Sequence, residues 1–252
     1  MVWLKRIWDE MAQAVAIAAK DVRTYYMTPP MLMFGLFMPF FMFFSFSVRR
    51  GLGTEASVAR LLALTCFFTA SSVEGVIIPL ERRDKTFERL LAAPISLISI
   101  LLGKMLVGVF FTLGISLATL LVGWAFLKVT IVDPGLLVVC LILSTWAFSA
   151  LGLLFASFPT ASPGNIMMPS TLLRWPLLFI SGIFIPLDQM APWARAISYL
   201  SPLTYSQDLM NHAVLGQGLQ PLLLDLGAML FCLGLLLFPT IKLHDRARRL
   251  GL

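Results

Sequence analysis

Two ionisable residues, Glu74 and Arg174, interrupt apolar runs that are each long enough to cross a lipid bilayer. A charge near the bilayer centre costs about 2.5–3.5 kcal/mol on insertion scales, so each side chain needs a partner. At the helical rise of about 1.5 Å per residue, both lie at a similar distance from the same end of their runs. We therefore predict an ion pair between Glu74 and Arg174, which either joins two helices or closes a path between them.

Motifs for catalysis or metal binding are absent from the sequence. It contains no His-Glu-x-x-His, no Gly-x-Ser-x-Gly and no cluster of cysteine and histidine. The cysteines lie inside apolar runs, as inert core thiols usually do. The phosphate-binding loop Gly-x-x-x-x-Gly-Lys-Ser/Thr is also missing. We expect no catalytic residue, no metal site and no cofactor on this chain, so any work driven by ATP requires a partner.

The composition identifies the class of protein. Hydrophobic residues make up 59% of the 252 residues, charged residues only 13%, and the mean hydropathy is +0.89. Soluble domains carry about 25% charged residues, so these values indicate an integral membrane protein. The net charge of +6 does not indicate a nucleic-acid partner, because the basic residues flank apolar runs instead of forming a basic face.

The hydropathy pattern predicts a single all-α membrane domain over residues 1–252. An amphipathic helix at residues 3–27, lying in the membrane interface, should precede six transmembrane helices. We expect two short helices at the outer interface within 188–218 and a tail at 243–252. The six predicted spans are 30–48, 58–80, 97–127, 134–158, 165–187 and 219–242.

Lysine and arginine concentrate on one side of these spans. That side holds both ends of the chain and the segment 81–96, between the second and third spans. Because basic residues accumulate on the cytoplasmic side, the pattern predicts a multi-pass protein of the inner (plasma) membrane with both termini in the cytoplasm.

The segment 81–94 combines many charges with a short apolar side and ends at a proline. Such a segment is suited to pressing against another protein, with leucines as anchors and charges on the rim. The residues that we expect to contact that partner are Arg82, Arg83, Glu88, Arg89, Leu90 and Leu91.

The first predicted span is rich in methionine and phenylalanine. Soft and aromatic side chains suit a surface that meets varied apolar ligands, although plain lipid contact or helix packing explains them equally well. The candidate path residues are Phe34, Phe37, Met38 and Phe41.

Two stretches of sequence resemble a known family. Residues 81–96, ERRDKTFERLLAAPIS, are similar to the Glu-Arg-x-x-Gly-Thr-x-Glu-x-Leu-x-x-(Thr/Ala)-Pro-(Val/Ile)-Ser run found in the membrane-spanning permeases of type-two ABC exporters. Residues 181–205 resemble that family's Ser-Gly-x-x-x-Pro, Pro-Trp and Asn-Pro-(Leu/Val)-Thr-Tyr motifs. Lys85 replaces the usual glycine, Ser201 replaces the usual asparagine, and Asn211-His212 falls where an arginine often occurs.

The resemblance implies a permease subunit of an exporter for drugs, lipooligosaccharides or polysaccharides. It implies two permeases, which we expect to form a homodimer, although pairing with a different permease is the open alternative. It also implies two separate ABC ATP-binding subunits, which bind ATP and Mg²⁺. The substrate would be amphipathic or lipid-linked. Two alternatives remain: an ion-gradient-driven secondary transporter, which normally shows broken helices and an inverted repeat, and a membrane transferase, which needs a catalytic cluster.

Overall fold

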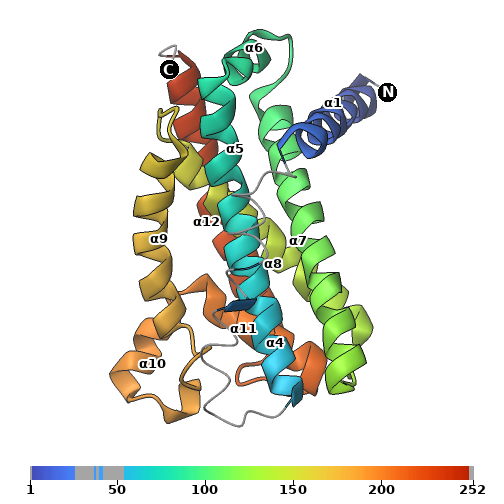
Figure 1. Ribbon diagram of the computed structural model, residues 1–252, viewed down its shortest axis with the longest axis vertical. Coiled ribbons are helices and arrows are strands. Elements are labelled where there is room, and N and C mark those ends of the chain that lie inside the picture. The colour runs from blue at the N-terminus through green and yellow to red at the C-terminus, as the bar shows by residue number, and fades with distance from the viewer. Residues whose placement is uncertain (1, 26–36, 38–39, 42–53, 250–252) are drawn as a thin grey trace.

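The computed structural model describes residues 2–25, 37, 40–41 and 54–249, and this part of the chain is helical throughout apart from its turns (Figure 1). No strand occurs in these ranges, so the predicted all-α fold is confirmed. The elements are α1 (Val2–Tyr25), α4 (Thr54–Thr65), a π-helical turn (Cys66–Ala70), α5 (Ser71–Arg83), α6 (Thr86–Ala92), α7 (Leu97–Leu127), α8 (Pro134–Ala156), α9 (Pro163–Ile180), a 3-10 turn (Leu187–Gln189), α10 (Pro192–Ser198), α11 (Pro202–Leu215) and α12 (Leu222–Arg249).

Four helical segments in the described ranges are long and apolar enough to cross a membrane. They are Glu55–Arg83, Leu97–Ala125, Pro134–Ala156 and Leu222–Arg249. They correspond to the predicted second, third, fourth and sixth spans. The predicted first span, 30–48, lies outside the described residues except for three positions.

The predicted fifth span, 165–187, forms α9, an 18-residue helix that is not among these four segments. Two internal prolines, Pro169 and Pro176, and the buried Arg174 reduce its apolar character. The chain leaves the helix after Ile180 and continues as turns toward α10. The number of six spans therefore stays a prediction.

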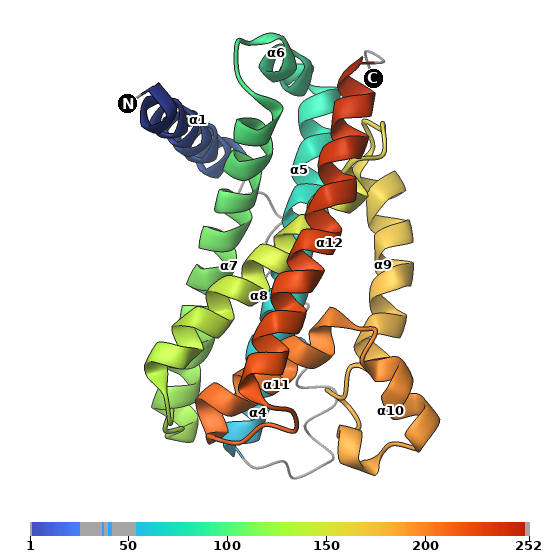
Figure 2. The same ribbon diagram turned by 180° about the vertical axis from the view of Figure 1, so that it is seen from behind.

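The segment formed by α4, the π-helical turn and α5 lies at the centre of the helix assembly. An apolar stretch of 18 residues in this segment is completely buried, whereas only 11% of the corresponding stretch in α12 is buried. In the π-helical turn, the ring of Phe67 packs edge-to-face on Phe148 of α8, with 5.1 Å between ring centroids. The second predicted span is thus enclosed by other helices, and α12 forms an outer wall (Figure 2).

Local sequence signals explain where several helices begin and end. The Ser96 side chain accepts a hydrogen bond from the Ser99 N–H at the start of α7, and Asp133 does the same for Leu136 at the start of α8. Gly216 ends α11 with a φ of +69°, a conformation that glycine adopts without strain. These caps fix the lengths of helices that have little amphipathic character.

Helix α1 crosses α7 near the end of the molecule that carries α6 and both termini (Figure 1). The side that meets the rest of the protein is built from small and medium residues, including Ala14, Ile17 and Ala18. The large apolar residues of the predicted stripe are exposed instead, namely Trp8, Met11, Val15 and Val22. The helix observed at Val2–Tyr25 matches the predicted 3–27, and its exposed stripe has the chemistry that a membrane interface requires.

We predict that Gly103→Ala separates α1 from α7. A Cβ atom at Gly103 would lie 2.8 Å from the Ala14 carbonyl oxygen and 3.0 Å from Ile17 Cβ. Such overpacking costs about 1–3 kcal/mol, so the melting temperature of the purified protein should fall. Gly114→Ala on the same helix is the matched control, since nothing lies within 4 Å of its added methyl group. Equal melting temperatures for the two variants would contradict the close packing.

Candidate functional site

The segment predicted to meet a partner protein lies at one end of the molecule. It comprises the end of α5, a two-residue turn and α6, and both chain termini lie at the same end (Figure 1). We call residues 81–94 the coupling segment. It continues the span Glu55–Arg83 beyond the end of α5, and one side of it is exposed.

The apolar residues of α6 point toward the protein's own core. Phe87 is buried, and Leu90 and Leu91 are partly buried against a cluster that includes Ile78 and Ile100. This arrangement differs from the expectation that the leucines are free anchors for a partner. The surface that remains for a partner consists mainly of exposed polar and charged residues: Arg83, Asp84, Lys85, Glu88 and Arg89.

Lys85 joins α5 to α6 in the left-handed conformation, with φ 55° and ψ 21°. The resembling family usually has glycine at this position, and glycine reaches the left-handed region without a steric penalty. A residue with a Cβ atom pays roughly 1–2 kcal/mol there. The departure from the family motif therefore leaves the turn intact but strained.

Arg82 bonds within the protein and does not extend from it. Its guanidinium donates to the backbone carbonyl of Phe158, in the turn between α8 and α9, and lies 5.3 Å from the centroid of the Phe87 ring. Among the residues predicted to meet a partner, Arg82 thus ties the coupling segment to the α8–α9 turn. Arg83, Glu88 and Arg89 remain exposed.

Four charged side chains form a cluster beneath the coupling segment, which we call the charge cluster. Lys104 of α7 donates to Asp21 of α1 at 2.6 Å and to Glu81 of α5 at 2.5 Å. Lys20 of α1 donates to the other oxygen of Glu81 at 2.5 Å and lies 2.9 Å from Asp21. Asp21, Glu81 and Lys104 are buried, and the two positive charges balance the two negative ones.

The charge cluster fixes α1, α5 and α7 to one another. Burial lowers the pKa of the Lys20 ammonium, but its hydrogen bonds to Glu81 and Asp21 outweigh this effect, so the pKa is raised. The sequence analysis did not predict this cluster. Asp21 and Lys104 lie at apolar positions of their helices, and this was the available signal for buried partners.

Glu74 and Arg174 are both buried, but they bind different partners. Glu74 accepts a hydrogen bond from Ser149 Oγ at 2.6 Å. Arg174 donates to Ser72 Oγ at 2.9 Å and to the Ser71 carbonyl at 2.5 Å. Within the described ranges the two side chains form no direct ion pair. The predicted ion pair is therefore absent, although the helices that carry the two residues, α5 and α9, are in contact.

Glycines create the space around Glu74. A Cβ atom on Gly108 of α7 would collide with one carboxylate oxygen, and one on Gly152 of α8 would lie 2.9 Å from the other. Glu74 therefore occupies a narrow slot between two helices, where Ser149 binds one carboxylate oxygen and the other has no hydrogen-bond partner within the described residues.

The candidate path residues are only partly described. Phe37 and Phe41 expose 63% and 77% of their surface, whereas Phe34 and Met38 lie outside the described residues. The exposure of the two phenylalanines fits either contact with lipid or contact with an apolar ligand.

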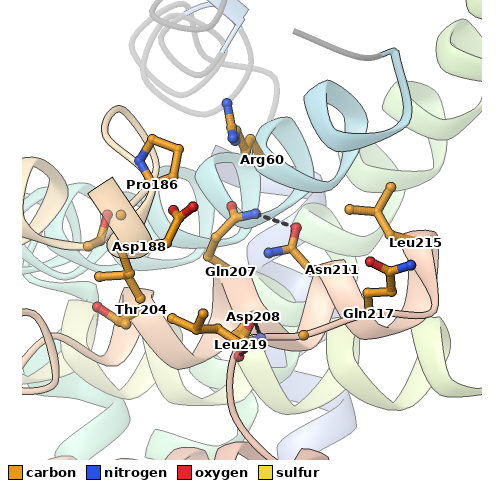
Figure 3. A pocket seen from close by; sticks show the side chains of 14 residues that line it. Arg60, Pro186, Asp188, Thr204, Gln207, Asp208, Asn211, Leu215, Gln217 and Leu219 are labelled. Carbon is orange, nitrogen blue, oxygen red and sulfur yellow. Dashed lines mark hydrogen bonds between the residues drawn. The ribbon is translucent and has the colours of Figure 1, made fainter. Parts of the chain in front are cut away.

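A polar pocket of about 270 Å³ lies at the opposite end of the molecule, between α4, α11, the turns that follow α9 and the turn that follows α11 (Figure 3). Arg60, Asp188, Gln207, Asp208 and Asn211 contribute to its lining. The sequence analysis did not predict this pocket, because its residues are dispersed from position 60 to position 219.

The long apolar helices indicate a multi-pass α-helical membrane protein. Comparison with known families agrees with this class. The family model "ABC-2 type transporter" matches residues 12–215. The chain belongs to this family and is a permease component of an ABC transporter. It is also 29% identical over 214 residues to Nodulation protein J of Neorhizobium galegae, an alignment that covers 78% of this chain and 75% of that protein.

We predict that Lys104→Gln strongly destabilises the protein. The change leaves Asp21 and Glu81 with only the half-exposed Lys20, and an uncompensated buried charge costs about 3–5 kcal/mol. The measurement is the melting temperature of the purified permease. Lys242→Gln, at an exposed position of α12, is the control and should change stability by less than about 0.5 kcal/mol. Similar behaviour of the two variants would argue against the charge cluster.

We predict that Lys85→Gly stabilises the permease by up to about 1 kcal/mol. Glycine removes the steric cost of the left-handed conformation, although its greater freedom in the unfolded chain offsets part of the gain. Lys85→Ala is the control, because alanine also lacks the lysine charge but keeps the Cβ atom. Thermal unfolding of the two variants should rank glycine above alanine, and the opposite order would show that the turn is not strained.

Proposed function

We propose that this permease exports an amphipathic or lipid-linked substrate and receives the energy for this through the coupling segment. In this proposal the permease lies in the inner membrane with both termini in the cytoplasm. Two copies of the chain associate with two ABC ATP-binding subunits, which bind and hydrolyse ATP with Mg²⁺. The observation that supports it is an exposed charged helix, α6, attached directly to the most deeply buried helix of the protein.

A force on α6 has a short route into the membrane. The α6 helix follows α5 after the turn at Lys85, and its own residue Phe87 packs into the buried apolar cluster beneath it. Glu81, at the end of α5, is bonded to Lys20 of α1 and Lys104 of α7. A displacement of α6 would therefore move three helices together, because breaking buried charge pairs is costly.

The exposed apolar surfaces support the proposed class of substrate. Phe37, Phe41 and the outward side of α12 offer apolar contacts along the length of the protein. A substrate with a lipid tail can follow such a surface while its polar part crosses between two permease copies. The name of the nodulation relative specifies no substrate, so it adds support only for the type of protein.

Reconstitution tests the proposal. The permease would be co-purified with its cognate ATP-binding subunit, bound lipid or glycan identified by mass spectrometry, and movement of that molecule followed in proteoliposomes. We expect transport only with ATP and the ATP-binding subunit, and no effect of a protonophore. Transport by the permease alone, driven by an ion gradient, would favour the secondary-transporter alternative.

We predict that the double change Arg83→Glu and Arg89→Glu weakens the complex with the ATP-binding subunit by about ten-fold or more. Both side chains are exposed, and reversing charges at an interface places like charges together. The melting temperature of the isolated permease should stay nearly unchanged. Arg248→Glu, an exposed arginine near the end of α12, is the control. Binding is measured by co-purification and by stimulation of ATP hydrolysis, and unchanged binding would place the contact elsewhere.

A further inference from the structure

Three potential metal ligands meet at the end of the molecule opposite the coupling segment. Asp208 and His212 lie on successive turns of α11, and Asp225 lies in the first turn of α12. One ligand atom from each residue lies within 4.8 Å of those of the other two. His212 Nε2 and Asp225 Oδ2 are 3.8 Å apart.

Asp225 is the observation that points to a ligand. Its side chain is completely buried, and neither carboxylate oxygen has a hydrogen-bond partner within the described residues. A buried carboxylate without donors carries a large desolvation cost, so proteins pair such a group or use it to coordinate a metal. His212 does not pair with it, because His212 Nε2 is 2.8 Å from the Gln220 carbonyl oxygen and 3.8 Å from Asp225 Oδ2.

The surroundings hold the other two ligands in place. The Asp208 carboxylate accepts hydrogen bonds from the Leu219 N–H at 2.8 Å and from the Gln220 N–H at 2.8 Å. The Gln220 side chain donates to Tyr199 Oη at 2.7 Å. A Cβ atom at Gly218 would collide with the His212 ring, so the chain there passes directly over the imidazole. Such outer contacts orient metal ligands in known sites.

We propose that Asp208, His212 and Asp225 bind one divalent transition-metal ion of the zinc type. Zinc bonds to imidazole nitrogen and carboxylate oxygen are about 2.0–2.2 Å long, so atoms bound to one ion lie no more than about 4.4 Å apart. Small rotations of the carboxylates bring the three groups within that range. The Gln220 carbonyl, beside His212 Nε2, is placed to act as a fourth ligand.

Charge and ligand type select the ion. With a neutral imidazole, the site contains two negative charges, which a divalent cation compensates. Imidazole favours zinc and its neighbours in the transition series, whereas magnesium and calcium prefer sets made only of oxygen. Neither the histidine–aspartate spacing within α11 nor the distant Asp225 matches a metal motif, which explains why the sequence predicted no metal site.

The polar pocket provides access to the site. Of the three ligands, Asp208 lines the pocket, together with Gly218 and Leu219 of the turn between α11 and α12. In Figure 3, Arg60 lies on one side of the pocket and Asp208 with Leu219 on the other. A bound ion would tie the last turns of α11 to the start of α12, fixing the hairpin at this end of the permease.

The test uses the full-length permease, purified without a polyhistidine tag and stripped with EDTA. Zinc, manganese, magnesium and calcium chlorides are added separately, and bound metal is measured after gel filtration together with the melting temperature. We expect about one zinc ion per chain and a higher melting temperature, with little effect of magnesium or calcium. Asp225→Asn and His212→Gln should each weaken zinc binding at least about ten-fold.

Asp188→Asn is the matched control, since Asp188 lines the same pocket but is not one of the three ligands. The His212 side chain is 17% exposed, so its variant should fold even where the Asp225 variant does not. Zinc binding that survives both Asp225→Asn and His212→Gln would overturn the proposal. Absence of bound metal in the wild-type chain, with Asp225→Asn more stable than wild type, would also overturn it and show that the two carboxylates share a proton.

Discussion

The bonds of Lys104 to Asp21 and Glu81 are the interaction on which the coupling end of this permease depends. An ammonium group on a membrane-embedded helix is tolerated only with negative partners, and here they come from the helix that precedes all spans and from the helix that leads to α6. The same contacts place Glu81 at the origin of the coupling segment. The helices α1, α5 and α7 are therefore positioned by one local electrostatic requirement.

Hydropathy predicted much of the fold because the bilayer requires long apolar helices. The spans predicted at 97–127 and 134–158 agree closely with α7 and α8. The segment at 165–187 was harder to predict, because prolines and Arg174 shorten its apolar stretch and composition alone does not show where a helix ends. Only one side of this helix is buried, including Arg174, while apolar residues such as Met168 and Leu172 stay exposed.

The candidate site was predicted in location but not in chemistry. The motif at 81–96 identified the segment that carries the exposed charges, but the leucines expected at its surface turn inward with Phe87. Side-chain partners were less predictable. Glu74 and Arg174 were the two charges in the spans that were expected to pair, yet Ser149 binds Glu74, and Ser71 and Ser72 bind Arg174. Hydroxyl and carbonyl groups are abundant and leave no signal in a hydropathy profile.

The π-helical turn at Cys66–Ala70 affects how the central span can be read and altered. A π-helical turn accommodates an extra residue, and one residue corresponds to about 100° around a regular helix. A helical wheel drawn from α5 and continued into α4 would assign side chains to the wrong faces by about that angle. In scanning mutagenesis of this span, the face on which each side chain lies should therefore be assigned separately for α4 and α5. A deletion within 66–70 would keep the side chains of both halves on their present faces better than a deletion elsewhere in the helix.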